Sequence, residues 1–234
     1  MPSQTSVEIQ PFEKTDIREA VLLGQVAFAE TNRLAYTGPL SPSSIDAMVA
    51  QREASADTEP HVTTFKAVDV STGKMVGLAR WAIWETDQVV EKSVDEVVRD
   101  RLSAPVAERR DEVARAMWTL VQVGKREILG VGKIEGNEKG IKLRKRIELE
   151  ALCVHPDYQG RGIAKRFLAW GVGEAEMLGL DVYLEATEAG RPVYEKTGFQ
   201  AVRKEEFGLD GIGETSLTFM ILPAKAVSEV KDEL

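Results

Sequence analysis

The sequence contains few of the residues that form disulfides and metal sites. Among 234 residues there is one cysteine, Cys153, and there are two histidines, His61 and His155. One cysteine excludes an internal disulfide and is compatible with a reducing compartment, and the lack of a Cys/His cluster argues against a zinc site. We therefore expect no metal, and we interpret Cys153, within a predicted strand, as a core or cofactor-lining residue.

The chain also lacks an excess of positive charge and lacks long apolar runs. It carries 30 Lys and Arg against 38 Asp and Glu, a net charge of −8. This charge argues against a nucleic-acid partner, because phosphate backbones attract cations, and it mildly favours a cationic substrate. No apolar segment approaches the length of a membrane span, so no membrane partner is expected.

No secretion signal is visible at the start, although the last four residues spell a retention signal. Lys231–Leu234 is the sequence KDEL, which retains proteins that are already inside the endoplasmic reticulum. Residues 1–10 have neither the basic start nor the apolar segment of a signal peptide. We therefore interpret the KDEL ending as coincidental and expect a cytoplasmic protein.

One stretch, Leu149–Leu168, combines a predicted strand, a glycine turn and a helix. Alternation from Leu149 to Cys153 is typical of a strand, and Pro156 ends it because proline has no amide hydrogen for the ladder. The apolar spacing becomes helical from Ile163. Such a junction gathers free backbone amides at a helix N-terminus, where they can hold an anion. By itself, a short glycine turn is equally compatible with a plain strand–helix connection.

Three segments resemble one family in the same order along the chain. Gln159–Ala164 (QGRGIA) is similar to the Gln/Arg-x-x-Gly-x-Gly/Ala pattern of the GNAT superfamily of acyl-CoA-dependent N-acyltransferases. Leu152–Pro156 (LCVHP) resembles the family's fourth strand and its exit, and Tyr194–Phe199 (YEKTGF) resembles its tyrosine-x-x-x-Gly-Phe ending. The layout of the whole chain also resembles fungal members of the family.

The resemblance implies that the anion is the pyrophosphate of acyl-CoA, with acetyl-CoA as the co-substrate. Glycines in the turn would let the backbone approach the phosphates, and nearby cations would add charge. Backbone groups where the fourth and fifth strands diverge would pair with the pantetheine arm. The residues expected to bind this co-substrate are Cys153, Val154, Gln159, Gly160, Arg161, Gly162, Ile163, Ala164 and Lys165.

Acyl transfer to an amine needs a base and a proton donor. At pH 7 only about one lysine-like amine in 10³ is neutral, so a carboxylate or a water chain must remove a proton. The resemblance nominates Glu148 as the base, with Glu150 as the close competitor, although an exposed strand face would explain both residues equally. Tyr194 matches the family tyrosine that donates to the departing sulfur. We expect direct attack in a ternary complex, without a covalent acyl-enzyme.

The alternating elements predict an α/β (α+β) fold, with a mixed, mostly antiparallel sheet and helices on both faces. We expect a single GNAT-like domain over residues 1–223 and a polar tail over 224–234. Residues 86–140 form a predicted helical insertion between the third and fourth strands, which could cover the substrate cleft or form a homodimer surface. Within it, Gly130–Ile134 is predicted to be a plain loop.

In this family, the early helices and the third strand border the acceptor pocket. This places three candidate substrate residues in the chain, Tyr36, Trp81 and Trp84, with core packing as the alternative for at least one tryptophan. The predicted function is transfer of an acetyl group to a primary amine of a small molecule. A CoA-binding module without catalysis and a protein or peptide N-acetyltransferase are the alternatives. We favour a small acceptor because the insertion would close a peptide groove.

Overall fold

A seven-stranded sheet forms the centre of the protein, of which the computed structural model describes residues 6–209 and 213–225. The strand order is β1-β2-β3-β7-β8-β10-β9, and every neighbouring pair is antiparallel except β7 and β8. The strands are β1 (Val7–Pro11), β2 (Val62–Asp69), β3 (Met75–Trp84), β7 (Arg146–Val154), β8 (Val182–Thr187), β9 (Gln200–Leu209) and β10 (Gly213–Leu222). This mixed, mostly antiparallel sheet confirms the predicted fold class. The KDEL ending lies outside the described residues.

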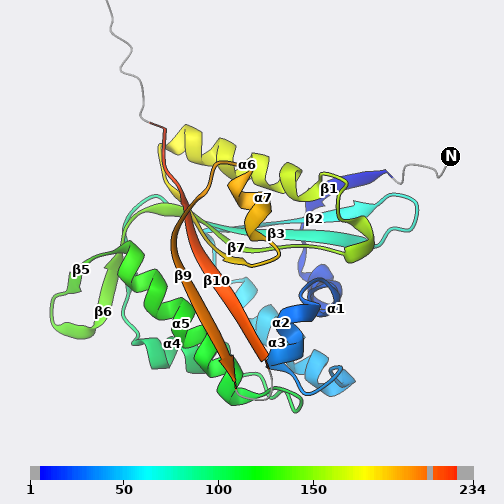
Figure 1. The fold of residues 1–234 in the computed structure, drawn as a ribbon, viewed down its shortest axis with the longest axis horizontal. Coiled ribbons are helices and arrows are strands. Elements are labelled where there is room, and N and C mark those ends of the chain that lie inside the picture. The colour runs from blue at the N-terminus through cyan, green and yellow to red at the C-terminus, as the bar shows by residue number, and fades with distance from the viewer. Residues whose placement is uncertain (1–5, 210–212, 226–234) are drawn as a thin grey trace, which may run out of the picture.

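Helices cover both faces of the sheet, as Figure 1 shows. On one face, α1 packs against β3 and β7, and α6 packs against β3, β7 and β8 from the other. The helices outside the insertion are α1 (Ile17–Ala27), α2 (Ala29–Ala35), α3 (Pro42–Ala56), α6 (Ile163–Leu178) and α7 (Arg191–Glu195), with short 3-10 turns η1 (Lys14–Asp16) and η2 (Pro156–Tyr158). In the described part of the chain, no helix is both long and apolar enough to cross a bilayer.

The main hydrophobic core lies between the sheet and α6, and Trp81 is part of it. The Trp81 residue is 0% exposed. Its indole packs onto Gly171 of α6 so closely that a Cβ there would lie 2.3 Å from the ring. The prediction that Trp81 contacts substrate is therefore wrong, because the side chain points into the core on the α6 face.

The insertion contains the two expected helices and also a second, three-stranded sheet. Its helices are α4 (Val94–Arg101) and α5 (Asp111–Leu129), and its strands are β4 (Gln88–Val90), β5 (Gly130–Ile134) and β6 (Asn137–Leu143), in the order β4-β6-β5. The prediction of a loop at Gly130–Ile134 is wrong, because this segment pairs with β6. Helix α5 packs against β9 and against α2. The insertion therefore borders the main sheet at the end that β9 forms.

Candidate active site

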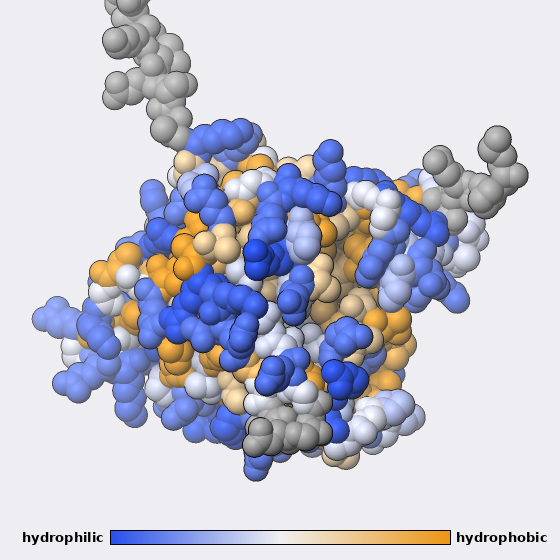
Figure 2. Space-filling model, viewed as in Figure 1, coloured by the Kyte–Doolittle hydropathy of each residue, from blue (hydrophilic) through white to orange (hydrophobic). Residues whose placement is uncertain are grey.

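A gap opens in the main sheet where β7 and β8 separate. The two strands pair only over Ile147–Leu149 and Val182–Leu184. Beyond this point β7 continues along β3, whereas β8 continues along β10, and Figure 1 shows β7 and β10 running in different directions. The gap-facing side of β7 therefore carries backbone N–H and C=O groups without a strand partner. In Figure 2 weakly polar and apolar surface lies between charged side chains near the middle of the same view.

The glycine turn before α6 has the geometry of an anion site. Gly160 and Gly162 have φ values of 73° and 78°, a left-handed conformation that side chains other than glycine rarely adopt. A Cβ on either glycine would meet no atom within 4 Å, so open space lies beside the turn. Gly162 is the N-cap of α6, and no side chain caps the helix. The amides of Ile163–Lys165 are therefore available to an anion, and the helix dipole favours it.

Side chains around the turn mainly hold its shape. The Gln159 side-chain amide donates to the carbonyl of Val154 over 3.2 Å, and Arg161 donates to the carbonyl of Asp157 over 2.8 Å. Ile163 is buried and anchors the first turn of α6 in the core. Binding of the predicted pyrophosphate would therefore depend mostly on backbone amides.

Cys153 faces α1 instead of the gap. Its side chain packs with Ala20, Leu23 and Met75. Burial raises the pKa of the Cys153 thiol to about 12, so the thiol stays protonated and unreactive at neutral pH. Its interpretation as a core residue is confirmed, and only its backbone belongs to the edge of β7 that borders the gap.

Tyr194 lies on α7, which packs against β8, and it belongs to the main core. The residue is 7% exposed, and its ring packs edge-on against Phe199 with 5.8 Å between the ring centroids. Burial raises the pKa of Tyr194, and the nearby Cys153 adds to the rise. The Tyr194 hydroxyl forms no hydrogen bond with any residue in the described ranges, so its proton is available to a ligand.

A buried network of charges joins the insertion to the two diverging strands. Lys125 of α5 forms an ion pair with Glu148 of β7, and Glu148 also accepts from Arg146 at 2.6 Å and 3.1 Å. On β8, Glu185 lies 3.9 Å from the Lys125 ammonium and accepts a 2.8 Å hydrogen bond from the Tyr183 hydroxyl. Residues far apart in the sequence therefore place two carboxylates side by side at the gap.

The two carboxylates have opposite pKa shifts. Burial alone would raise the pKa of Glu148, but Lys125 and Arg146 outweigh it and lower this pKa. For Glu185, burial raises the pKa, Lys125 offsets only part of the rise, and the negative charge of Glu148 adds to it. Glu148 is thus held as a weakly basic carboxylate, whereas Glu185 is the better proton acceptor. Glu185 is missing from the candidates predicted from the sequence. The only feature of the sequence that could have indicated it is a carboxylate within a short apolar strand.

A β-bulge changes the environment predicted for Glu150. Arg80 of β3 is opposite Ala151 and Trp81 is opposite Leu149, so Glu150 has no residue opposite it. The bulge also places Leu149 in the main core and Cys153 in the cluster against α1, although regular alternation along a strand predicts that both lie on one face. Glu150 is exposed, outside the buried network of Glu148, and forms an ion pair with Arg80 at 2.6 Å.

The remaining predicted substrate residues lie on the side of the sheet opposite α6. Trp84 is half-buried, stacks on His61 with 3.9 Å between the ring centroids, and lies beside Arg146, whose guanidinium is 5.6 Å from its ring. Burial raises the pKa of Tyr36, and nearby arginines, including Arg52, offset part of the rise. Tyr36 therefore lies among cationic side chains, and Trp84 lies at the edge of the buried network.

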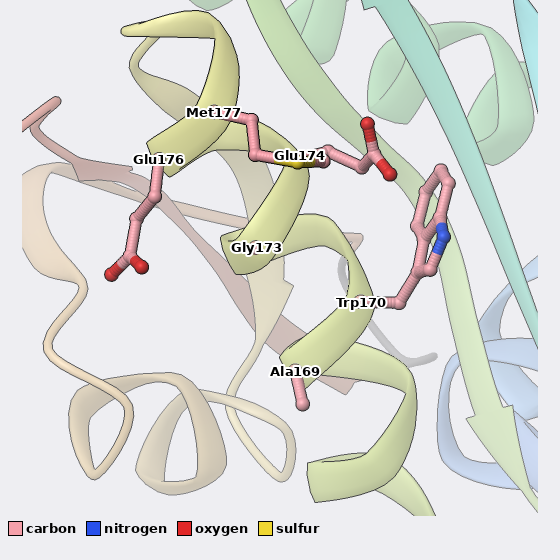
Figure 3. Close-up of a pocket in the computed structure, with 6 residues that line it drawn as sticks. All are labelled: Ala169, Trp170, Gly173, Glu174, Glu176 and Met177. Atoms are coloured by element: carbon pink, nitrogen blue, oxygen red, sulfur yellow. The ribbon is translucent and has the colours of Figure 1, made fainter.

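A shallow hollow of about 560 Å³ lies elsewhere, on the C-terminal half of α6. Figure 3 shows its lining, with Trp170 and Glu174 pointing to one side of the helix and Glu176 to the other. All six lining residues come from this one helix, away from the glycine turn at its start. In the part of the chain that the structure describes, no three His, Cys, Asp or Glu side chains are grouped to hold a metal.

Comparison with known proteins agrees with this geometry. The family profile described as an acetyltransferase (GNAT) domain matches residues 85–219. No curated protein matches the sequence. Arylalkylamine N-acetyltransferase 2 from Aedes aegypti has a similar fold, with a TM-score of 0.58 and 15% identity over 94% of this chain and 100% of that chain.

Two further solved structures have the same fold. Polyamine N-acetyltransferase from Drosophila melanogaster has a TM-score of 0.55 and 13% identity over 93% of this chain and 100% of that chain. The yncA protein of Salmonella typhimurium, solved with its cofactor acetyl-CoA, has a TM-score of 0.52 and 15% identity over 95% of this chain and 96% of that chain. Since the family profile spans more than half of the sequence and the fold agrees, the chain belongs to the GNAT acetyltransferases, which use acetyl-CoA as their co-substrate.

Proposed function

We propose that this protein transfers the acetyl group of acetyl-CoA to a primary amine of a small molecule, by direct attack in a ternary complex. The observation that carries this proposal is the gap between β7 and β8, where the carboxylates of Glu148 and Glu185 lie together and the open edge of β7 leads toward the glycine turn. The glycine turn and the open edge of β7 fit acetyl-CoA, which supplies the activated acetyl thioester. The chain itself supplies donors, a base and shelter from water.

Tyr194 acts as the hydrogen-bond donor to the departing sulfur. Because burial raises its pKa, the phenol remains protonated throughout the neutral range. Complete proton transfer from such a phenol to a thiolate, whose conjugate thiol has a pKa of about 8.5, is uphill. Tyr194 therefore stabilises the developing negative charge by a directed hydrogen bond in a site with little water.

Glu185 is the proposed general base, directly or through a water molecule. Its raised pKa brings the carboxylate closer to neutrality than that of Glu148, so it accepts a proton more readily. Lys125 and the Tyr183 hydroxyl hold Glu185 in place. Glu148 then acts mainly by keeping Lys125 in position, a different role from the base that the resemblance nominates.

Glu185→Gln is expected to lower kcat/KM roughly 100-fold, because a positioned base typically contributes 10²–10⁴. In the wild type, kcat/KM should rise with pH through the raised pKa of Glu185, since only the ionised carboxylate accepts a proton. The variant should lose that rise. The measurement is thiol release from acetyl-CoA between pH 5 and 9.

The matched control for this substitution is Glu188→Gln, at an exposed glutamate three residues further along the chain, which should leave the profile unchanged. Glu150→Gln tests the competing carboxylate. If that substitution flattens the pH profile while Glu185→Gln does not, Glu150 is the base.

The acceptor class is tested by a panel of amines. Two proteins of similar fold are named for small amine acceptors, a polyamine and arylalkylamines. In this chain α5 of the insertion packs against β9 of the main sheet and α4 packs against α5, which favours a small acceptor over an extended peptide. Thiol release should exceed the amine-free background with polyamines, amino acids, arylamines or aminoglycosides, and should stay at background with short peptides.

The same panel separates the alternatives. Release with peptides alone would indicate a protein or peptide N-acetyltransferase. Background rates throughout, together with a higher melting temperature in acetyl-CoA, would indicate a binding module without catalysis.

A further inference from the structure

Two arginines from different helices lie together beside the gap. Arg52 is on α3 and Arg101 is the last residue of α4. The adjacent residue, Gln51, ties the two helices together, since its side-chain amide donates to the carbonyls of Asp100 at 3.0 Å and Arg101 at 3.2 Å. Arg52 and Arg101 are also close enough for each charge to be felt by the other. The contact between α3 and α4 therefore concentrates positive charge.

Arg101 points toward the diverging strands. Its guanidinium lies 3.5 Å from the ring centroid of Trp118 on α5, which fixes the plane of the cation. The charges of Glu150 on β7 and Glu185 on β8 both act on it. Arg101 is exposed to solvent, yet the surrounding protein lowers its pKa by desolvation. Arg101 is therefore accessible to a ligand, and its charge lies within electrostatic range of carboxylates on both diverging strands.

Three other cations near the diverging strands are already paired. Arg80 forms ion pairs with Glu59 and Glu150, both at 2.6 Å. Lys125 and Arg146 form ion pairs with Glu148, and Lys125 also faces Glu185.

By contrast, neither the Arg52 nor the Arg101 side chain forms an ion pair or hydrogen bond with any residue of the described ranges. Their N–H groups therefore remain available to an anionic ligand, and the planar fork of a guanidinium suits carboxylate or phosphate oxygens.

We propose that Arg101 and Arg52 bind an anionic group of the acceptor, a carboxylate or a phosphate, so that the substrate is an amine that also carries a negative charge. This proposal rests on the proposed acetyltransferase function and specifies its substrate class. Stacking on Trp118 orders Arg101 before the ligand arrives, which lowers the entropic cost of binding. The overall charge of −8 favours a cation, but the local charge that an acceptor meets is positive.

The test compares amines that differ only in the anion. The pairs are L-phenylalanine with 2-phenylethylamine, L-lysine with cadaverine, and O-phosphoethanolamine with ethanolamine. The first two pairs test a carboxylate and the third tests a phosphate. In the wild type, at least one anionic member should have a kcat/KM roughly tenfold or more above its partner. Arg101→Gln should remove this preference by raising KM, with little change in kcat.

Arg115→Gln is the matched control, because Arg115 is an exposed arginine on α5 that is not stacked on Trp118. It should preserve the preference. Arg101→Gln should also keep the rise in melting temperature that acetyl-CoA produces, since the glycine turn is intact. Equal or better use of the partner amines that lack the anionic group, or an unchanged preference in Arg101→Gln, would overturn the proposal.

A binding measurement keeps this test independent of turnover. If no amine released thiol, the proposed function would fail, but the anion site would still be testable by thermal shift with CoA present. A stabilisation by O-phosphoethanolamine or by L-phenylalanine that Arg101→Gln abolishes would support the site. No stabilisation by either compound, or the same stabilisation in Arg101→Gln, would overturn it.

Discussion

Replacing Tyr194 by phenylalanine is expected to lower kcat about 100-fold while the affinity for acetyl-CoA stays nearly unchanged. The substitution removes only the hydroxyl, and loss of one hydrogen-bond donor to a developing negative charge typically costs about 10²–10³ in kcat. The ring packing against Phe199 is retained, so the fold should be little affected. The measurements are kcat from thiol release and acetyl-CoA affinity from calorimetry.

The control for Tyr194→Phe is Tyr158→Phe. The Tyr158 hydroxyl donates to Asp69, away from the gap, so its loss should change the melting temperature and leave kcat close to wild type. Equal activity of Tyr194→Phe and wild type would remove Tyr194 from the mechanism. Because burial raises the pKa of Tyr194, its deprotonation should not reduce the wild-type rate below about pH 10.

Lys125→Met is expected to destabilise the protein by about 3 kcal/mol at pH 7. Breaking a buried ion pair typically costs 3–5 kcal/mol, and the low end applies because Arg146 still binds Glu148. The Lys125 and Glu148 side chains are 16% and 3% exposed, so water screens them little. For a chain of 234 residues, this loss lowers the melting temperature by about 6–12 °C.

The pH dependence identifies the origin of this loss. In the wild type the pKa of Glu148 is below its ordinary value of 4.5, so the ion pair stabilises the protein above that pH and the stability is lost as the pH falls through the lowered pKa. Without Lys125 one of the causes that lower this pKa is lost, so Glu148 takes up a proton at a higher pH in the variant. The difference in stability between wild type and variant should therefore shrink as the pH falls from the pKa of Glu148 in the variant to its lowered pKa in the wild type.

Lys133→Met is the control for this substitution, because Lys133 is exposed on β5, and it should change the melting temperature little. The double variant Lys125→Met/Glu148→Gln should recover part of the loss, since a neutral amide is cheaper to bury than an unpaired carboxylate. If Lys125→Met melts within 2 °C of wild type, the buried pair contributes little to stability.

Much of the sheet follows from local patterns in the sequence. The strands of the β2–β3 hairpin are predicted as Val62–Val70 and Met75–Trp84, and they are observed as Val62–Asp69 and Met75–Trp84. Alternation and a glycine-containing turn suffice here, because both act within a few residues. The second sheet in the insertion is not predicted, because β5 is exposed and has no alternating apolar face.

The candidate base illustrates the limit of local patterns. The alternation on β7 suggests that Glu148 and Glu150 are equivalent, but the bulge leaves Glu150 exposed and Glu148 in a buried network. Lys125, which controls the pKa of Glu148 and of Glu185, comes from a helix of the insertion. The alternation of residues reveals neither the bulge nor this long-range contact. The choice of the candidate base therefore needs the tertiary structure.

The sequence by itself determines the proposed co-substrate end of the site. The glycine turn, the strand before it and the start of α6 are contiguous, and the positive φ values of Gly160 and Gly162 are a local requirement that glycine meets. The proposed acceptor end is decided only by tertiary structure. Arg52, Arg101 and Glu185 come from α3, α4 and β8. Their pKa values are shifted by burial and by neighbouring charges that only the folded chain brings together.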